Sequence, residues 1–196
     1  MIYPIIKQYS IDNKYALLIR HADRDLIPQG SYGNEILLND KGKQNALSFG
    51  ESIAKLKVNK ILTSPVTRCI QTSEFIAQGY GKNIEIIQTT ALGNPGLHIS
   101  DAKIAGEFYL EHGVHEILTR VRKNEPVPGI TDLKHFLIMI TDFLKQNTEE
   151  NGITIFITHD FLIAMYHFCL NGTVYTDKSW VDYLSGLTIK NGKYEK

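Results

Sequence analysis

A chain of 196 residues is long enough for one compact domain with a hydrophobic core of its own. Hydrophobic residues make up 43% of the chain and charged residues 21%, as in an ordinary globular protein, and 21 Lys and Arg balance 21 Asp and Glu. The formal net charge of zero argues against a nucleic-acid-binding protein that works by overall attraction to phosphates, but it is compatible with a local cationic pocket.

The cysteines and the hydrophobic segments indicate the cellular compartment in which the protein works. Cys69 and Cys169 are too few for a disulfide framework and lie in stretches typical of buried helices, which favours a reducing environment inside the cell. Residues 1–7 lack the basic and apolar regions of a signal peptide, and no run approaches the roughly 18 apolar residues of a membrane span. We therefore expect a cytoplasmic protein without a membrane or nucleic-acid partner.

Strands and helices are predicted to alternate in the first half of the chain. Asn39-Asp40 can cap a helix, and Ser64-Pro65 is a start signal for a helix that stops at Gly79. The strands are short apolar runs bounded by polar residues, the last of them weak. In chain order, the elements are a strand at 15–19, a helix after 39–40, a strand at 60–63, a helix at 64–78 and a strand at 84–88.

The second half begins with a less regular segment at about 93–129, which ends in the helix-breaking stretch 126–129. Asn171-Gly172 is a helix C-cap signal, and Asn191-Gly192 favours a hairpin turn. In chain order, the elements are helices at 102–112 and 114–123, a helix that opens at Thr131, a strand at 153–158, a helix from 159 to 171 and a strand at 183–189.

This alternation predicts an α/β protein with a mainly parallel sheet and helices on both faces, a three-layer sandwich. We expect residues 1–196 to form a single domain, with the segment at about 93–129 inserted as a cap over the sheet edge.

Histidines and arginines follow three of the predicted strands. Arg20 and His21 follow the first strand, and Arg68 lies in the opening turn of the helix after the second. His159 and Asp160 follow the strand at 153–158. Since ligands of open α/β sheets bind beyond the carboxyl ends of the strands, we expect these side chains to line one crevice.

These residue types suit a phosphoryl group. Arginine binds phosphate oxygens bidentately, and Arg68 lies near a helix N-terminus, which also favours an anion. A neutral histidine can attack phosphorus through a ring nitrogen. One positive charge about 5 Å from His21 disfavours the imidazolium by at most roughly 3 kcal/mol at an effective dielectric near 20, so we expect a lowered pKa. A backbone carbonyl that accepts from the other ring nitrogen would fix the tautomer.

Each residue also has a plainer explanation. His21 can be a satisfied polar group, Arg20 a surface charge and Asp160 a helix cap, while Arg68 can pair with Glu74 or with solvent. The common position of the three segments, rather than any one residue, favours the pocket. The remaining histidines show no metal-ligand spacing, so we expect no metal site; they are His98, His112, His115, His135 and His167.

Three motifs and a late histidine resemble a known family. The motifs are Leu17-Leu18-Ile19-Arg20-His21-Ala22, Leu38-Asn39-Asp40-Lys41-Gly42-Lys43-Gln44-Asn45-Ala46 and Ser64-Pro65-Val66-Thr67-Arg68-Cys69-Ile70-Gln71-Thr72, and the late histidine is in Thr158-His159. They are similar to the Arg-His-Gly, Leu-Thr-x-x-Gly-x-x-Gln-Ala and Ser-Pro-x-x-Arg-x-x-Gln-Thr blocks of the histidine phosphatase superfamily. That superfamily includes the phosphoglycerate mutases and the histidine acid phosphatases.

The resemblance implies a phosphoglycerate mutase-like fold and a phosphatase that hydrolyses phosphate monoesters of small molecules without a cofactor. His21 would become phosphohistidine, and Arg20, Arg68 and His159 would bind the phosphate. A phosphoglycerate-type mutase and a non-catalytic phosphate-binding relative remain as alternatives. The physiological substrate and the oligomeric state are not indicated by the sequence.

The resemblance leaves two candidates for the acid that protonates the leaving oxygen. One branch of the family has a glutamate in the middle of the chain, and the other an aspartate directly after the second histidine. Asp160 follows His159 in this way, and Arg24 resembles an additional phosphate-binding arginine of that second branch. The short chain and the Ser-Pro-x-x-Arg block resemble the first branch. We take Asp160 as the acid and Glu107 as the alternative.

Overall fold

The computed structural model describes residues 9–28, 30–176 and 178–195. Residues 1–7, whose composition argues against a signal peptide, lie outside these ranges. In the described part of the chain, no helix is long and apolar enough to cross a membrane.

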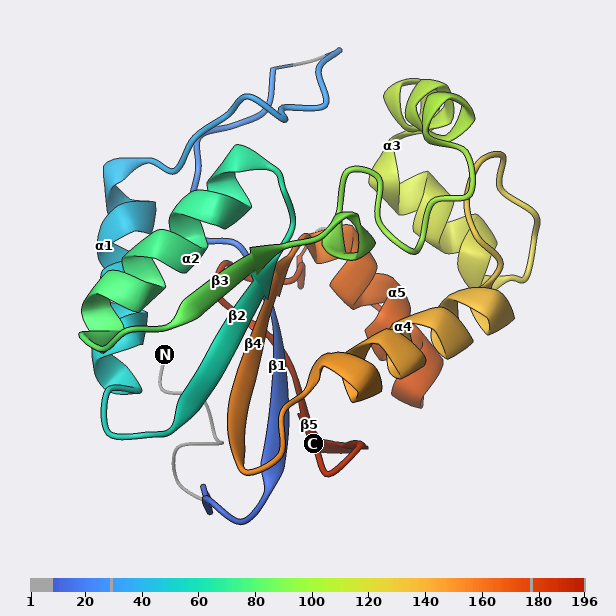
Figure 1. Cartoon of the computed structure of the whole chain (residues 1–196). Coiled ribbons are helices and arrows are strands. Elements are labelled where there is room, and N and C mark those ends of the chain that lie inside the picture. Colours follow the sequence, from blue (N-terminus) through green and yellow to red (C-terminus); the bar gives the residue numbers. More distant parts are fainter. Residues whose placement is uncertain (1–8, 29, 177, 196) are drawn as a thin grey trace.

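A six-stranded sheet forms the centre of the molecule (Figure 1). Its strands, in spatial order, are β3 (Glu85–Gln88), β2 (Val58–Thr63), β4 (Gly152–Thr158), β1 (Lys14–Arg20), β5 (Gly186–Lys190) and β6 (Lys193–Glu195). The first four are parallel to one another, whereas β5 and β6 are antiparallel to their neighbours. The prediction of a mainly parallel α/β sheet is confirmed.

Helices cover both faces of this sheet (Figure 1). On one face lie α1 (Asp40–Ser52) and α2 (Thr67–Tyr80); on the other lie α3 (Ala102–Arg122), α4 (Leu133–Asn147) and α5 (Asp160–Asn171). Alternate residues of β1 enter the two cores: Leu17 and Ile19 pack with α1 and α2, and Leu18 packs with the other three helices. All seven residues of β4 are buried, as expected for a central strand covered on both sides.

Two helix boundaries differ from the prediction. The helix after Ser64-Pro65 begins only at Thr67, because the Ser64 hydroxyl bonds elsewhere and does not cap it. The prediction that Gly79 ends this helix is wrong, since α2 continues to Tyr80 and ends at the left-handed Gly81. Gly79 instead lets α1 approach, because a Cβ there would lie 2.0 Å from the carbonyl oxygen of Leu47.

Other helix ends follow their sequence signals. The Asn39 side chain accepts from the backbone N–H of Gly42 and caps α1, and the left-handed Gly172 ends α5. The helix predicted to open at Thr131 begins at Leu133, because Asp132 is its cap. The two predicted helices of the segment at 93–129 form α3, which is kinked at Gly113.

The last strand is shorter than predicted. It begins at Gly186 rather than at residue 183, because Leu184 has a left-handed backbone (φ 53°) that interrupts the extended chain. Tyr183 therefore lies in the loop before β5. The turn at Asn191-Gly192 joins β5 to β6 as an antiparallel hairpin, as predicted.

Candidate active site

The predicted crevice forms where β1, β2 and β4 end. In the sheet register Arg20 lies opposite Thr158, and Thr63 opposite Ile157, so the three strands end at the same level. The backbone N–H of His21 donates to the carbonyl of Thr158, 3.0 Å away. The residues that follow the three strands are thus brought together as the sequence predicts.

His21 is buried, with 1% of its surface exposed, and both ring nitrogens have partners. Nδ1 lies 2.8 Å from the carbonyl oxygen of Ala22, and Nε2 accepts from Nε of Arg68 at 3.0 Å. A neutral ring protonated on Nδ1 satisfies both contacts, which leaves the lone pair on Nε2. Ala22, which stands where the family motif has glycine, is not among the residues with positive φ, so its methyl group causes no backbone strain.

The environment of His21 keeps the ring neutral. Burial lowers its pKa well below the ordinary value; a proton on His159 would lower it further, and the charges of Arg68 and Arg20 act in the same direction. The hydrogen bond to the Ala22 carbonyl acts in the opposite direction but is outweighed. Because only the neutral imidazole is a nucleophile, this environment suits attack on phosphorus.

Arg68 connects the elements of the site. Besides its bond to His21, its Nη1 donates to the carbonyl oxygen of Gly33 at 2.6 Å, and its Nη2 lies 3.2 Å from Nδ1 of His159. The side chain is 6% exposed and reaches from the first turn of α2 to the loop before α1. In the described part of the chain it makes no ion pair with Glu74, so the plainer explanation of Arg68 does not hold.

His159 faces Arg68 with one nitrogen and Ser64 with the other. Its Nε2 lies 3.1 Å from the hydroxyl oxygen of Ser64. Burial and the charge of Arg68 lower the pKa of His159 to about 3, so its ring is neutral. Gly93 packs directly against this ring, and a Cβ at Gly93 would lie 2.6 Å from Nε2.

Asp160 holds Arg20. Its Oδ2 pairs with Nη2 of Arg20 at 2.8 Å and accepts from the indole nitrogen of Trp180 at 3.0 Å. Arg20 also donates to the carbonyl of Val181 and stacks on Tyr183, 4.0 Å from the ring centre. Burial raises the pKa of the Asp160 carboxyl, but Arg20, Trp180 and His159 outweigh this, so the pKa lies below its ordinary value. The group is a carboxylate in this state.

Two of the predicted site residues do not contact the side chains described above. Arg24 donates to the carbonyl oxygen of Asp25 at 2.7 Å, and its buried Nε has no hydrogen-bond partner among the described residues. Glu107 is exposed on α3 and does not line the cavity beside Arg68. Within the ranges that the structure describes, no group of three or more His, Cys, Asp and Glu side chains could hold a metal ion.

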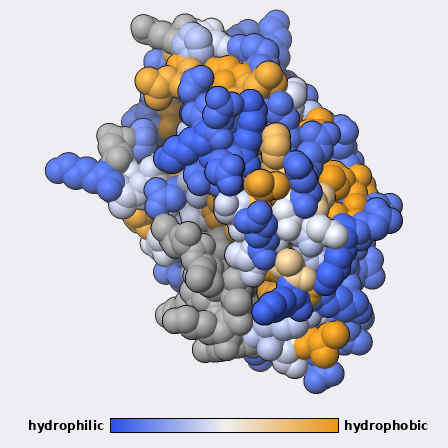
Figure 2. Space-filling model, turned by 90° about the vertical axis from the view of Figure 1, so that its left-hand side faces the viewer, coloured by the Kyte–Doolittle hydropathy of each residue, from blue (hydrophilic) through white to orange (hydrophobic). Residues whose placement is uncertain are grey.

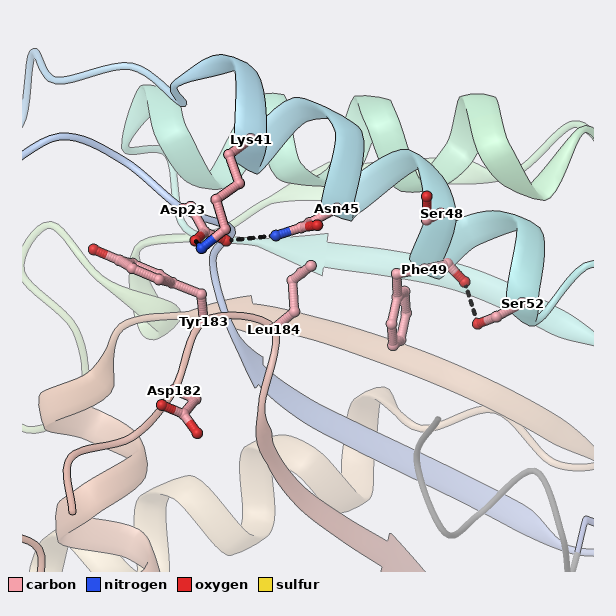
Figure 3. Close-up of a pocket in the computed structure, with 9 residues that line it drawn as sticks. All are labelled: Asp23, Lys41, Asn45, Ser48, Phe49, Ser52, Asp182, Tyr183 and Leu184. Carbon is pink, nitrogen blue, oxygen red and sulfur yellow. Dashed lines mark hydrogen bonds and ion pairs between the residues drawn. The ribbon is translucent and has the colours of Figure 1, made fainter. Parts of the chain in front are cut away.

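A cavity of about 370 Å³ opens beside Arg68 and His159. A second hollow, of about 480 Å³, lies beside Tyr183 between α1 and the loop before β5 (Figure 3). It contains the carboxylates of Asp23 and Asp182, and Asp23 is paired with Lys41 at 2.8 Å. Since these carboxylates would repel an anion, the cavity beside Arg68 is a better site for phosphate than the hollow beside Tyr183. The face of the molecule on the side of α1 is mainly hydrophilic, with a hydrophobic band across its upper part (Figure 2).

The sequence analysis did not predict the contacts of several residues of the site. Ser64 was expected to cap a helix but contacts His159 instead. Trp180 and Tyr183 come from the loop before β5, where the chain offers no motif, and only the antiparallel pairing of β5 with β1 brings them beside Arg20.

His98 lines the same cavity and is 6% exposed. Burial lowers its pKa from 6.5 to about 4, with Asp160 opposing the shift. Between these pH values the unfolded chain binds a proton that the folded chain excludes, so the free energy of unfolding falls as the pH falls, by about 3 kcal/mol for this residue. In His98→Phe, urea unfolding from pH 7 to pH 4 should show a loss of stability smaller by this amount.

The exposed His135 provides the control for this measurement. His135→Phe should keep the steep pH dependence of the unaltered protein. An equal loss in His98→Phe and in the unaltered protein would show that His98 is not kept neutral by the fold.

A family model and several known proteins match this chain. Residues 16–94 match the model of the histidine phosphatase superfamily (branch 1). A curated 2,3-bisphosphoglycerate-dependent phosphoglycerate mutase from Thermoplasma acidophilum is 24% identical over 185 residues, 91% of this chain and 84% of that protein. The segment that the family model matches contains Arg20, His21 and Arg68 and ends before Glu107 and Asp160. The family model therefore does not select between the two candidate acids.

Solved structures share the fold at low identity. A phosphoglycerate mutase from Bacillus anthracis is 18% identical with a TM-score of 0.64, covering 94% of this chain and 92% of that one. A mycobacterial glucosyl-3-phosphoglycerate phosphatase is 16% identical with a TM-score of 0.58, covering 91% and 90%. The prediction of a phosphoglycerate mutase-like fold is confirmed.

Proposed function

Because the chain belongs to the histidine phosphatase superfamily, in its branch 1, we propose that it is a phosphatase that hydrolyses phosphate monoesters through a phosphohistidine on His21. One observation carries this proposal. The buried, neutral ring of His21 is oriented by the Ala22 carbonyl through Nδ1, and its Nε2 lone pair faces Arg68, a group that binds phosphate oxygens.

The proposed reaction has two displacements at phosphorus. A phosphate group enters beside Arg68 and His159, its oxygens replace the contacts that these side chains make in the free protein, and Arg20 binds a further oxygen. Nε2 of His21 attacks phosphorus, the P–O bond to the leaving group breaks, and the leaving oxygen takes a proton. Water then attacks phosphorus and passes a proton to the carboxylate that donated in the first displacement; the P–N bond breaks, which releases inorganic phosphate and restores neutral His21.

We propose Asp160 as the proton donor, with Glu107 as the alternative. In the free protein the ion pair with Arg20 lowers the pKa of Asp160. When Arg20 turns to the phosphate, the carboxyl loses that partner while it stays beside the buried site. Its pKa then rises, which favours the protonated form that can donate to the leaving oxygen.

Asp160→Asn is expected to lower kcat/KM, which reports the first displacement, about 100- to 1,000-fold for an alkyl phosphate, whose leaving oxygen needs a proton. For 4-nitrophenyl phosphate the loss should be much smaller, because nitrophenolate leaves without protonation. Steady-state rates for both esters measure the difference. Glu107→Gln, the same chemical change on exposed α3, should stay within about twofold for both.

Two outcomes would contradict this assignment. A loss of equal size for both esters in Asp160→Asn would mean that Asp160 only holds Arg20. A larger loss in Glu107→Gln, confined to the alkyl phosphate, would transfer the role to Glu107. Any turnover that depends on His21 and Asp160 also rejects the alternative of a non-catalytic phosphate-binding protein.

A phosphoglycerate-type mutase is the second candidate, favoured by the 24% identity with the Thermoplasma acidophilum enzyme. In a mutase the phosphohistidine returns its phosphate to an organic acceptor. The mutase needs a pocket that binds the acceptor and shields the phosphohistidine from water. A phosphoenzyme that transfers its label to phosphoglycerates faster than to water would favour the mutase.

A further inference from the structure

The cavity beside Arg68 and His159 is where the part of the substrate beyond the phosphate would lie. Its volume of about 370 Å³ is near the lower end of the range for small-molecule sites, about 300 to 1,000 Å³. Its walls come from the loop that contains Tyr32, from the start of α3, from the loop after β3 and from Phe161 of α5. Apart from Phe161, these walls belong to the loop at 25–36 and to the segment at about 93–129, in which the sequence contains no recognisable motif.

The charges of the cavity are sparse. Among the described residues that line it, Arg68 is the only Lys or Arg, and there is no Asp or Glu. A bound phosphate already occupies Arg68. A second anionic group in the cavity would therefore lack a cationic partner among these lining residues. Arg24, whose charge acts on Arg68 and Tyr109, does not line the cavity and donates to the carbonyl oxygen of Asp25. Burying an unpaired charge is strongly unfavourable.

The walls are mainly aromatic and apolar. The rings of Tyr32 and Tyr109 lie 6.5 Å apart on one side. The ring of Phe161 packs edge-on against His98, with 5.0 Å between ring centres, and Ile99 lies beside them. Such walls favour contact with the face or edge of a ring or with an apolar chain.

One wall residue has an unused hydrogen-bonding atom. Nδ1 of His98 is buried and has no partner in the part of the chain that the structure describes. An unpaired buried polar atom is costly, and a ligand that rearranges the ring and pairs it recovers part of that cost. The cavity therefore combines apolar walls with a few polar side chains, and His98 is the one of these with a buried ring nitrogen that has no partner among the described residues.

We propose that the substrate is a phosphate monoester whose leaving group is uncharged, carries a ring or a similar apolar body and bears one hydroxyl or comparable polar group that reaches His98. This proposal rests on the proposed phosphatase function. It separates the protein from enzymes that act on phosphoglycerates, because the carboxylate of such a substrate would find no Lys or Arg besides Arg68 among the described residues that line this cavity.

Three aryl phosphates of similar size and similar leaving-group acidity test the proposal: phenyl, 4-hydroxymethylphenyl and 4-carboxyphenyl phosphate. At pH 7.5 the value of kcat/KM for the carboxylate ester should be at least about tenfold below that of the hydroxymethyl ester. Ile99→Lys adds a cation to the wall and should reduce this gap about tenfold. Ile138→Lys, the same change at an exposed site of α4, should leave the gap unchanged.

His98→Phe keeps a ring of similar size and removes the polar atoms. It should lower kcat/KM for the hydroxymethyl ester about fivefold more than for phenyl phosphate. Equal loss for both esters would contradict the part assigned to His98, and equal kcat/KM for the carboxylate and hydroxymethyl esters in the unaltered protein would contradict the uncharged leaving group.

Binding separates a failure of this proposal from a failure of the proposed function. His21→Ala cannot form the phosphohistidine, so calorimetric titration of this variant reports affinity for the three esters without turnover. The same order of affinity is expected, with the carboxylate ester weakest. If the unaltered protein hydrolysed none of the esters while this order held, the phosphatase function would be wrong and the cavity assignment would stand; a reversed order would overturn the cavity assignment.

Discussion

Replacing His21 by Ala is expected to lower kcat for phosphate monoesters by at least about a thousandfold. The substitution removes the nucleophile, and the remaining arginine and histidine contacts can bind phosphate without accepting it covalently. Nε2 of His21 is the ring nitrogen that faces Arg68, and the substitution removes it together with the rest of the ring. Initial rates with 4-nitrophenyl phosphate measure the effect.

The matched control for this substitution is His135→Ala, at an exposed histidine of α4. It should keep full activity. Circular dichroism and thermal unfolding of both variants separate a chemical loss from a loss of fold. Equal activity of His21→Ala and the unaltered protein would mean that His21 is not the nucleophile.

Arg68→Lys should lower kcat/KM about 100- to 1,000-fold although the charge is kept. The guanidinium uses three nitrogens at once, toward His21, His159 and the carbonyl of Gly33. Lysine offers a single nitrogen and cannot orient a phosphate while it holds the loop at Gly33. Arg122→Lys, on α3, is the same change at a residue that only donates to Thr119 and Tyr175, and it should stay within about twofold.

The pH profile adds a second readout at Arg68. Burial, then His159 and then Arg68 lower the pKa of His21, and activity is lost on the acid side when this ring becomes protonated. Arg68→Met removes one of these charges, so its acid limb should move to higher pH, whereas Arg68→Lys should leave it in place. An unmoved limb in Arg68→Met would contradict the close approach of the two side chains.

The central contacts of the site could be predicted because they follow strands. The apolar runs at 15–19 and 153–158 mark where β1 and β4 end, and parallel strands end at one edge of the sheet. Arg20, His21 and His159 were therefore expected together, and the structure places them there. The lowered pKa of His21 was also expected, although burial contributes more than the arginines do.

The contacts between distant segments could not be predicted. The contact of Asp160 with Trp180 depends on β5 returning beside β1, and no local pattern encodes that neighbourhood. Glu107 was a candidate because one branch of the family that the sequence resembles has a glutamate in the middle of the chain, but Glu107 lies exposed on α3. Gly79 looked like a helix end because glycine often ends helices, whereas here it permits the close packing of α1 on α2.

The most direct test of a phosphohistidine at residue 21 is to trap it. The protein is mixed with ³²P-labelled phenyl phosphate, quenched in alkali within the first turnovers and digested, and the labelled peptide is located by mass spectrometry. We predict a label that is stable in alkali, labile in acid, carried by the peptide that contains His21 and absent from His21→Ala. Turnover without any covalent label, or a label on a peptide that lacks His21, would contradict the account.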